Sequence, residues 1–542
     1  MGKPAIDYGA VLIHQKIKRG KAGHVDRIRP PTLRKPLIIP SGQPLFFKID
    51  QIMMEINLKM RYRPFVIIFI IEVLMFIRKL LPFVEDYLNS LNDALTEYNP
   101  GIALSRIQKY WLGFCIMGIL QSNQINWTGF ARLSLGKYNK NAISWMFRHS
   151  KISWEHLFHI SLGVVLHRYG IRKGILAIDD TDKKRSKSVK TIYGCHKVKD
   201  KSTGGFFMGQ KLVFLALVTP KITIPAGFTF HRPDPALTKW FKENKRLKKK
   251  GIPAKERPKK PERSPSYPTI PALALKLLRE FKEYHPEILI QAIVADALYG
   301  TGDFMDKASN MFNGIQVISQ IRSNQKVKLK NQNLSVENYF KRNPVIDQKI
   351  QIRGGNEVPI DANSARIRVV AHKKKRFVIA LKYNGESECR YLVATDMTWR
   401  TLDIIEAYTL RWLIEVFFQD HKANEGWGTL TKQPGKEGSY RSLTLSLLVD
   451  HSLFFHPDQL ALLDNKMPAN TVGNLCKTIS VESLLALIKD ILAVDDPVAQ
   501  FENLSELMKE QFSDFKKSDK HMNARIWGNF QQSPSLKYKA AS

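Results

Sequence analysis

The chain has 542 residues, 44% of them hydrophobic and 25% charged, and this composition excludes a largely disordered protein. Its length exceeds what one hydrophobic core usually serves and predicts roughly two to four domains. The 84 Lys and Arg against 49 Asp and Glu give a formal net charge of +35. Such an excess indicates an anionic partner, first of all nucleic acid, because Lys and Arg release the counterions that condense on phosphates.

The four cysteines, Cys115, Cys195, Cys389 and Cys476, lie far apart and form no Cys-x-x-Cys pair. This spacing argues against a disulfide framework and a structural zinc site, and it suits a reducing compartment. The start of the chain shows no signal-peptide pattern. The most apolar stretch, residues 65–77, is shorter than the about 20 residues that a membrane span needs. We therefore expect a cytoplasmic protein with no membrane partner.

The first part of the chain divides into two segments. Residues 1–45 are basic, contain prolines and show no hydrophobic period, which predicts a lead-in that is disordered in whole or in part. Residues 46–168 contain long apolar runs of helical period separated by polar turns, which predicts a helical region. Its basic residues favour DNA binding by a helix-turn-helix, while a small helical bundle with ordinary surface charge is the alternative. These basic residues are Arg132, Lys137, Lys140 and Arg148.

From residue 169 the pattern changes to strands. Three short runs rich in β-branched and aromatic residues are followed by a helix and then by alternating strands and helices. The runs are 174–179, 211–220 and 221–230, the helix is 272–284, and the next strand is 288–296. This succession predicts an α/β fold with a ribonuclease-H-like catalytic core over 169–322 and 399–435. We expect a β-rich insertion over 323–398 and a helical C-terminal region over 436–542.

A strongly basic stretch interrupts this core. Residues 239–263 hold twelve Lys or Arg and three Glu, with three Pro, one Gly and no apolar period. The stretch is therefore predicted to be a loop or a partly disordered arm. It is interpreted either as an arm that clamps a phosphate backbone or as a loop that only keeps the protein soluble.

Acidic residues follow two of the predicted strands. Asp179 and Asp180 stand where one apolar run stops, and Asp296 stands at the end of another. The carboxyl ends of strands in an α/β sheet meet at one edge, and a helix packed over that edge can add Glu415. Carboxylates without His or Cys are ligands for Mg²⁺ or Mn²⁺, and two such ions cleave phosphodiesters. As an alternative, each Asp is an ordinary turn or cap residue.

The segment "AYTLRWLIEVFFQDHK" predicts a helix with four polar residues on one side. Tyr408, Arg411, Glu415 and Lys422 follow one another at steps of three, four and seven, which keeps them within roughly 60° around the helix axis. Glu415 would ligate metal, and Arg411 and Lys422 would hold phosphates. Tyr408 would bond to a phosphate or stack on a base. The alternative is an ordinary solvated helix face.

These four residues resemble the YREK signature, Y-x2-R-x3-E-x6-K, of insertion-sequence transposases of family four. That family is a DDE group with a ribonuclease-H-like core, and "AIDDT" and "VADALYG" are similar to its first and second aspartate strands. The resemblance implies that Asp179 or Asp180, with Asp296 and Glu415, form the catalytic set. Its motif favours Asp179, so that Asp179, Asp296 and Glu415 would bind two Mg²⁺ or Mn²⁺ ions. It also implies that Tyr408, Arg411 and Lys422 bind DNA phosphates.

The same resemblance implies a function. A transposase of this kind binds the terminal inverted repeats of its element, cleaves the ends and transfers the 3′-hydroxyl to target DNA. It would act on double-stranded DNA as a homodimer on paired ends, in a prokaryotic cytoplasm beside the nucleoid. Two alternatives stay open at this point: an inactive DNA-binding protein derived from a transposase, and a ribonuclease-H-like nuclease without strand transfer.

Overall fold

The structure is a computed structural model, and it describes residues 79–512 apart from short gaps. The gaps are residues 123–124, 186–190, 201–202, 344–345, 352–356, 431–432, 466 and 468. The predicted lead-in 1–45, the apolar stretch 65–77 and the chain beyond 512 lie outside the described residues. The elements given below belong to one compact unit, Met75–Lys199 and Phe206–Ser542. Within the described ranges, none of the helices has both the length and the apolar surface to cross a membrane.

Between residues 79 and 172, the described chain before the sheet contains five α-helices. They are α3 (Pro82–Tyr98), α4 (Arg106–Gln121), α5 (Trp127–Leu133), α6 (Lys140–His149) and α7 (Trp154–Arg168), with a 3-10 turn η1 (Pro100–Ile102) after α3. The start of α4 shows why helices form where they do. Ser105 accepts a hydrogen bond from the Gln108 backbone N–H, and the Gln108 side chain accepts one from the Ser105 N–H. This capping box satisfies two backbone donors that a helix start leaves open.

The central sheet has the strand order expected of a ribonuclease-H-like core. Its strands are β1 (Lys173–Lys184), β3 (Phe206–Val218), β4 (Thr223–His231), β5 (Leu289–Ala295) and β6 (Gln316–Ile321), with the short β2 (His196–Lys199) beside β3. β1, β3 and β4 are antiparallel neighbours, whereas β5 and β6 run parallel to β1. The order β4-β3-β1-β5-β6 confirms the predicted mixed α/β fold. Helices α9 (Ile270–Tyr284) and α10 (Gly302–Met311) flank β5 in the chain.

The β-rich insertion continues this sheet instead of forming a sheet of its own. Its elements are β7 (Lys326–Leu329), β8 (Gln332–Ser335), α11 (Val336–Lys341), β9 (Ile346–Gln351), β10 (Glu357–Val369), η4 (Val370–His372), β11 (Lys374–Tyr383) and β12 (Arg390–Ala394). β12 pairs with β6 of the core in antiparallel fashion, and β11 and β10 follow outward. Core and insertion therefore share one ladder of backbone hydrogen bonds.

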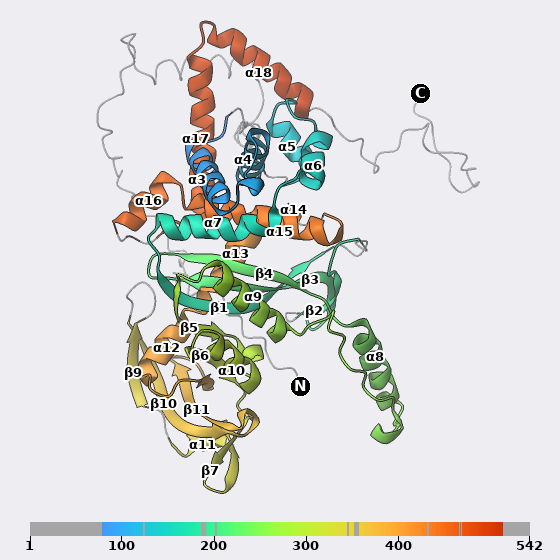
Figure 1. Cartoon of the computed structure of the whole chain (residues 1–542), viewed down its shortest axis with the longest axis vertical. Coiled ribbons are helices and arrows are strands. Elements are labelled where there is room, and N and C mark those ends of the chain that lie inside the picture. The colour runs from blue at the N-terminus through green and yellow to red at the C-terminus, as the bar shows by residue number, and fades with distance from the viewer. Residues whose placement is uncertain are drawn as a thin grey trace, which may run out of the picture. The chain divides into compact units, whose positions relative to one another are not determined.

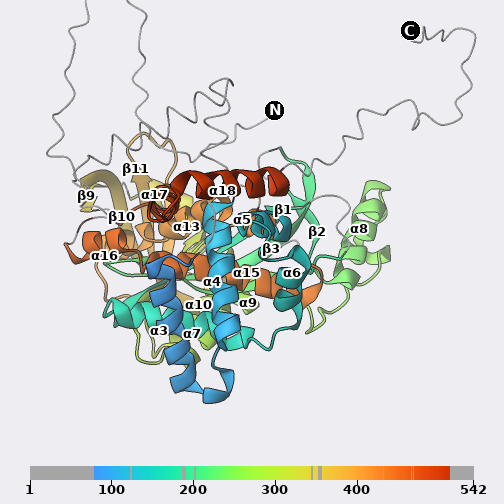
Figure 2. The ribbon, with the colours of Figure 1, turned by 90° about the horizontal axis from the view of Figure 1, so that it is seen from above.

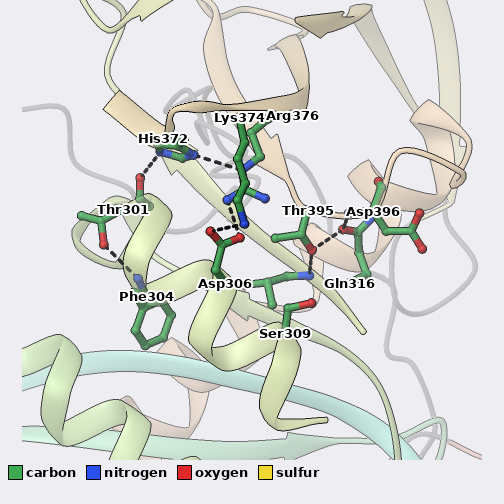
Figure 3. Close-up of polar contacts among 12 residues, drawn as sticks. Thr301, Phe304, Asp306, Ser309, Gln316, His372, Lys374, Arg376, Thr395 and Asp396 are labelled. Atoms are coloured by element: carbon green, nitrogen blue, oxygen red, sulfur yellow. Dashed lines mark hydrogen bonds and ion pairs between the residues drawn. The ribbon is translucent and has the colours of Figure 1, made fainter. Parts of the chain in front are cut away.

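A set of polar contacts fastens the insertion to the core (Figure 3). Asp306 on α10 accepts from Arg376 on β11 at 2.6 Å and lies 3.0 Å from the Lys374 ammonium. Arg376 is 4% exposed and also donates to His372 Nδ1 at 3.3 Å. The His372 Nε2–H in turn donates to the Gly300 carbonyl at 3.0 Å. A buried arginine with all of these partners holds the insertion in one position.

The described part of the chain after residue 400 is helical. It contains α12 (Thr401–Thr409), α13 (Trp412–Ala423), α14 (Trp427–Leu430), α15 (Gly435–Leu453), α16 (Pro457–Asp464), α17 (Val472–Leu492) and α18 (Pro497–Phe512). α15 packs on α4 and α7, and α17 packs on α4 (Figures 1 and 2). Ser161 of α7 hydrogen-bonds His451 of α15 at 2.7 Å. The helical segments before and after the sheet thus share one apolar core.

The basic stretch 239–263 is where the structure departs most from the sequence prediction. Instead of a loop, it contains most of an α-helix, α8 (Pro235–Lys249), followed by a short 3-10 turn η2 (Ala254–Glu256). Asp234 caps the helix by accepting hydrogen bonds from the N–H groups of Ala236 and Leu237. No Pro or Gly follows Pro235 until Gly251, and Lys and Arg are good helix formers. The prediction of an irregular segment is therefore wrong for residues 239–249.

Candidate active site

Asp179 and Asp296 stand side by side where the parallel pairing of β1 with β5 ends. In the register of β1 and β5, Ile178 pairs with Ala295, so the next residue of each strand is an acid. Asp296 then leaves the sheet into the 3-10 turn η3 (Ala297–Tyr299), and its carbonyl accepts from the Ser319 hydroxyl at 2.8 Å. Asp179 is 9% exposed and Asp296 is half-buried.

The strand that carries Asp179 is longer than the sequence indicates. The apolar run ends at Ile178, but β1 continues to Lys184 because β3 pairs with it as far as Lys184 opposite Gly209. Asp179 and Asp180 therefore lie within a strand and not in a turn, which excludes the turn-residue alternative for both. β5 ends at Ala295, so β1 pairs beyond Ile178 with β3 alone. The edge of β1 that β5 leaves unpaired is open to the helix that follows the insertion.

That helix is interrupted in the middle of the predicted motif. α12 ends at Thr409 and α13 begins at Trp412, with Leu410 and Arg411 between them. The backbone here makes tight bonds from each N–H to the carbonyl three residues earlier, as in a 3-10 helix: Arg411 N to Tyr408 O at 3.1 Å and Ile414 N to Arg411 O at 3.2 Å. The prediction of one continuous helix is wrong at this joint, which places Arg411 at the N-terminal end of α13.

Arg411 joins two of the predicted acids. One terminal nitrogen of its guanidinium donates to Asp179 Oδ2 at 2.7 Å, and the other donates to Glu415 Oε1 at 2.5 Å. Its side chain is 16% exposed. The arginine therefore forms a bridge between Asp179 of β1 and Glu415 of α13, which are far apart in sequence.

Lys422 and Tyr408 complete the predicted set on the same side. The Lys422 ammonium donates to the Thr181 hydroxyl at 2.6 Å, and Thr181 lies two residues beyond Asp179 on the same face of β1. Tyr408 lies beside Arg411, with the guanidinium 5.9 Å from its ring centre. Its hydroxyl is buried and has no hydrogen-bond partner among the described residues.

Asp180 points away from this group. Its carboxylate lies 2.6 Å from the Lys211 ammonium of β3, and the same lysine is 3.5 Å from Asp182. The structure thus brings Asp179, Asp296, Glu415, Arg411 and Lys422 to one edge and leaves Asp180 out. Sequence reasoning missed Lys211, and it placed Thr181 in the aspartate motif without a contact to Lys422. Lys211 is a charged residue at the start of the apolar run 211–220, which could have drawn attention to it. Its contact with Asp180 and Asp182 depends on the register of β1 and β3, which the sequence does not show.

Burial controls the charge at Asp179. Removal from water, with a smaller contribution from the neighbouring Asp296, raises the pKa of Asp179 to about 7 despite the opposing effect of the Arg411 guanidinium. Burial works against the charged form of Arg411, yet Tyr408, Asp179 and Glu415 together raise the pKa of Arg411 above its usual range. The site therefore contains three carboxyl groups, those of Asp179, Asp296 and Glu415, and Arg411 is the one arginine that bridges two of them.

A buried polar cluster supports the far end of α13. His421 Nδ1 and Glu425 Oε2 are 2.7 Å apart, both side chains are fully buried, and Glu425 bonds to Asp450 of α15. Burial lowers the pKa of His421 to about 3 and raises the pKa of both carboxyl groups. Burial therefore disfavours the charged form of all three groups, and the cluster ties the end of α13, next to Lys422, to α15.

A largely apolar hollow lies next to the acids. Its volume is about 370 Å³, and Tyr408 and Arg411 line it together with Gln320 of the core and Tyr383 and Arg390 of the insertion. The core, the insertion and the joint between α12 and α13 therefore all contribute to this hollow.

The donor set suits a hard divalent cation, although the side chains are not arranged around one. Within the described residues, no three His, Cys, Asp or Glu side chains converge as metal ligands would. The reason is visible in the contacts, since the Arg411 guanidinium lies between Asp179 and Glu415. A cationic group already occupies the position between two carboxylates, which is the kind of charge that Mg²⁺ or Mn²⁺ would supply.

Two known families match parts of the chain. Residues 123–344 match the family described as DDE superfamily endonuclease, and residues 269–432 match the family described as Transposase DDE domain. The first match includes Asp179 and Asp296, and the second includes Asp296 and all four residues from Tyr408 to Lys422. The chain is therefore similar to both families over these residues.

Other comparisons add little. None of the curated proteins matches the chain. The solved structure of a "piggyBac transposase synaptic complex with hairpin DNA" matches over 84% of this chain and 87% of that chain, at 8% sequence identity and a TM-score of 0.35. A TM-score this low does not establish a common fold, so the ribonuclease-H-like assignment rests on the strand order.

Proposed function

We propose that the chain is a DNA transposase of the DDE superfamily with a YREK-type site, similar to the insertion-sequence transposases of family four. It would bind the terminal inverted repeats of its element, cleave the ends and transfer the 3′-hydroxyl to target DNA, as a homodimer on paired ends. The observation that carries the proposal is the bridge from Asp179 through Arg411 to Glu415, next to Asp296. Matches to two DDE-superfamily families over the same residues support it.

In this proposal Asp179, Asp296 and Glu415 hold two Mg²⁺ or Mn²⁺ ions. When bound, such ions supply an activated water or 3′-hydroxyl and stabilise the leaving oxygen of the phosphodiester. The carboxylates contribute oxygen ligands, which these hard ions prefer. Asp180 is assigned a lesser role, because its carboxylate is paired with Lys211 on the opposite side of β1.

The cationic side chains of α13 position the DNA. Arg411 presents a planar fork that can exchange its carboxylate partners for two phosphate oxygens, and Lys422 presents a point charge. Thr181 fixes the Lys422 ammonium at the edge of β1, so Lys422 is aimed at the strand that carries Asp179. Tyr408 has a buried hydroxyl that is available as a hydrogen-bond donor to a phosphate or a base.

The test uses Glu415→Gln, which keeps the shape of the side chain and removes its charge. We expect DNA carrying the inverted repeats that flank the gene to be cleaved and joined by the unaltered protein with Mg²⁺. The variant should lose both activities, by a factor on the order of 10⁴, and should retain binding to the ends. Glu437→Gln is the matched control, because the Glu437 side chain is 80% exposed on α15.

Three results would contradict parts of the proposal. Strand transfer unchanged in Glu415→Gln would remove the glutamate from the catalytic set. Cleavage without joined products in the unaltered protein would indicate a nuclease without a transfer step. Binding without any strand breaks would indicate a DNA-binding protein that has lost its activity.

A further inference from the structure

Residues 234–264 form a closed arm outside the sheet, and Figure 1 shows its helix α8 projecting away from the core. Asp234 connects the two ends of the arm, since its carboxylate caps α8 and also accepts from the Ser264 N–H at 2.9 Å. The chain leaves the sheet after β4, forms α8 and returns along it to the same place. The arm is therefore a single folded projection with a narrow base.

One face of α8 is occupied by the returning segment. The Trp240 indole N–H donates to the Pro258 carbonyl at 2.7 Å, and Arg257 donates to the Asn244 side chain at 3.1 Å. The Lys260 ammonium lies 5.7 Å from the centre of the Phe241 ring. These contacts hold the arm in a defined shape, so the opposite face of α8 has a fixed orientation.

The opposite face is basic. At 100° per residue, five basic side chains fall within an arc of about 120°. They are Lys239, Lys242, Lys245, Arg246 and Lys249, and all five are exposed. Arg246 pairs with Glu243, and the other four show no ion pair with any described residue. We refer to these five side chains as the outer face of α8.

The base of the arm lies at the edge of the sheet that carries the acids. β4 ends at His231, which pairs with Lys211 of β3. Lys211 in turn contacts Asp180, next to Asp179. The arm begins three residues after His231. The basic projection and the candidate active site therefore arise from the same end of the central strands.

We propose that the outer face of α8 binds the phosphate backbone of double-stranded DNA that is held at the candidate active site. The identity of the partner rests on the proposed function. α8 is about 22 Å long at 1.5 Å per residue, and duplex DNA carries one negative charge per about 1.7 Å of its axis. Lys239 and Lys249 are about 15 Å apart along the helix, a span that passes several phosphates. Such contacts are independent of base sequence, so the arm strengthens and orients binding without selecting the site.

The test changes the five residues of the outer face to Gln, which favours helix about as well as Lys and Arg. Binding to a short fluorescent duplex of arbitrary sequence is measured over a range of salt concentrations. Each lost phosphate contact lowers the slope of log affinity against log salt by about 0.9, so we expect the slope to fall in magnitude by about four. Circular dichroism verifies that α8 remains folded.

The matched control removes five charges from the rest of the same arm. It changes Lys248, Lys250, Lys255, Lys259 and Arg263 to Gln, which leaves the outer face and the contacts of the returning segment with Trp240, Phe241 and Asn244 intact, and we expect a clearly smaller change in slope. An equal or larger effect of the control would overturn the assignment to the outer face. So would an unchanged slope in the outer-face variant, or a loss of binding confined to an RNA duplex. Failure of the unaltered protein to bind DNA at any salt concentration would instead contradict the proposed function.

Discussion

Two arginines connect distant elements to an aspartate in this protein, and the two aspartates respond in opposite ways. At the joint between core and insertion, burial alone would raise the pKa of Asp306, but hydrogen bonds from Arg376 and Lys374 outweigh it and lower the pKa. At the candidate active site, burial raises the pKa of Asp179 to about 7 although Arg411 bonds to it directly.

The difference lies in how many charges share each arginine. Asp306 is one carboxylate facing two cations, so its charge is fully compensated. Asp179 is more deeply buried, has Asp296 beside it, and shares Arg411 with Glu415. The charges at the joint between core and insertion are therefore balanced. At the candidate active site the carboxyl groups outnumber the bridging arginine, so additional cations would stabilise their charged forms.

The largest expected effect separates the two aspartates of β1. Asp179→Asn should reduce DNA cleavage by a factor on the order of 10⁴, since it removes one member of a set that acts as a unit. Asp180→Asn should cause a much smaller loss, because its carboxylate is paired with Lys211. The measurement is cleavage rate with Mg²⁺ for both variants, with thermal unfolding to show that both are folded. A larger loss for Asp180→Asn would transfer the main role to Asp180.

A smaller effect, on stability, is expected at the joint. Asp306→Ala leaves the 4% exposed Arg376 without its carboxylate, which should lower the free energy of unfolding by about 3 kcal/mol. Denaturant unfolding measures this loss. Asp303→Ala on the same helix is the control, because its pair with Lys307 is largely exposed and should contribute less than about 0.5 kcal/mol.

A double variant checks the cause of that loss. Asp306→Ala together with Arg376→Met removes both charges and should recover a large part of the stability, because a buried charge without a partner is the main penalty. If the double variant were less stable than Asp306→Ala, the loss would come from packing and not from the unpaired arginine.

The smallest effect concerns pH. The pKa of Asp306 is lowered in the folded protein, so its contribution to stability is present above the ordinary Asp pKa of about 3.9. This contribution is lost as pH falls through the folded-state pKa, because the unfolded chain takes up the proton first. The difference in unfolding free energy between the unaltered protein and Asp306→Asn should be constant near neutral pH and shrink in acid. A difference that grew in acid would contradict the sign of this shift.

Much of the fold could be predicted from local pattern. The runs at 174–179, 211–220 and 288–296 are β-branched and bounded by turn residues, and β1, β3 and β5 form there. The helices before and after the sheet also lie where the apolar period places them. Such patterns depend on the residue's immediate neighbours, which is why they can be recognised in a single sequence.

The errors occur where a distant partner decides the structure. Charge composition predicted a loop at 239–263, yet the returning segment and the Asp234 cap stabilise α8. The end of the apolar run at Ile178 predicted the end of a strand, yet pairing with β3 carries β1 to Lys184. The strands of the β-rich insertion were expected from local pattern, but only the pairing of β12 with β6 shows that they extend the core sheet.

By itself, the sequence supplied the candidate residues of the site: Asp179 or Asp180, Asp296 and Glu415 with two cations and a tyrosine, at spacings that resemble a known motif. Only the tertiary structure decided how these groups meet. Strand register sets Asp179 beside Asp296, and the break before Trp412 places Arg411 between Asp179 and Glu415. Residues alternate sides along a strand, so Asp179 faces α13 while Asp180 faces Lys211. Composition and spacing are properties of the chain, whereas register and burial exist only once the chain has folded.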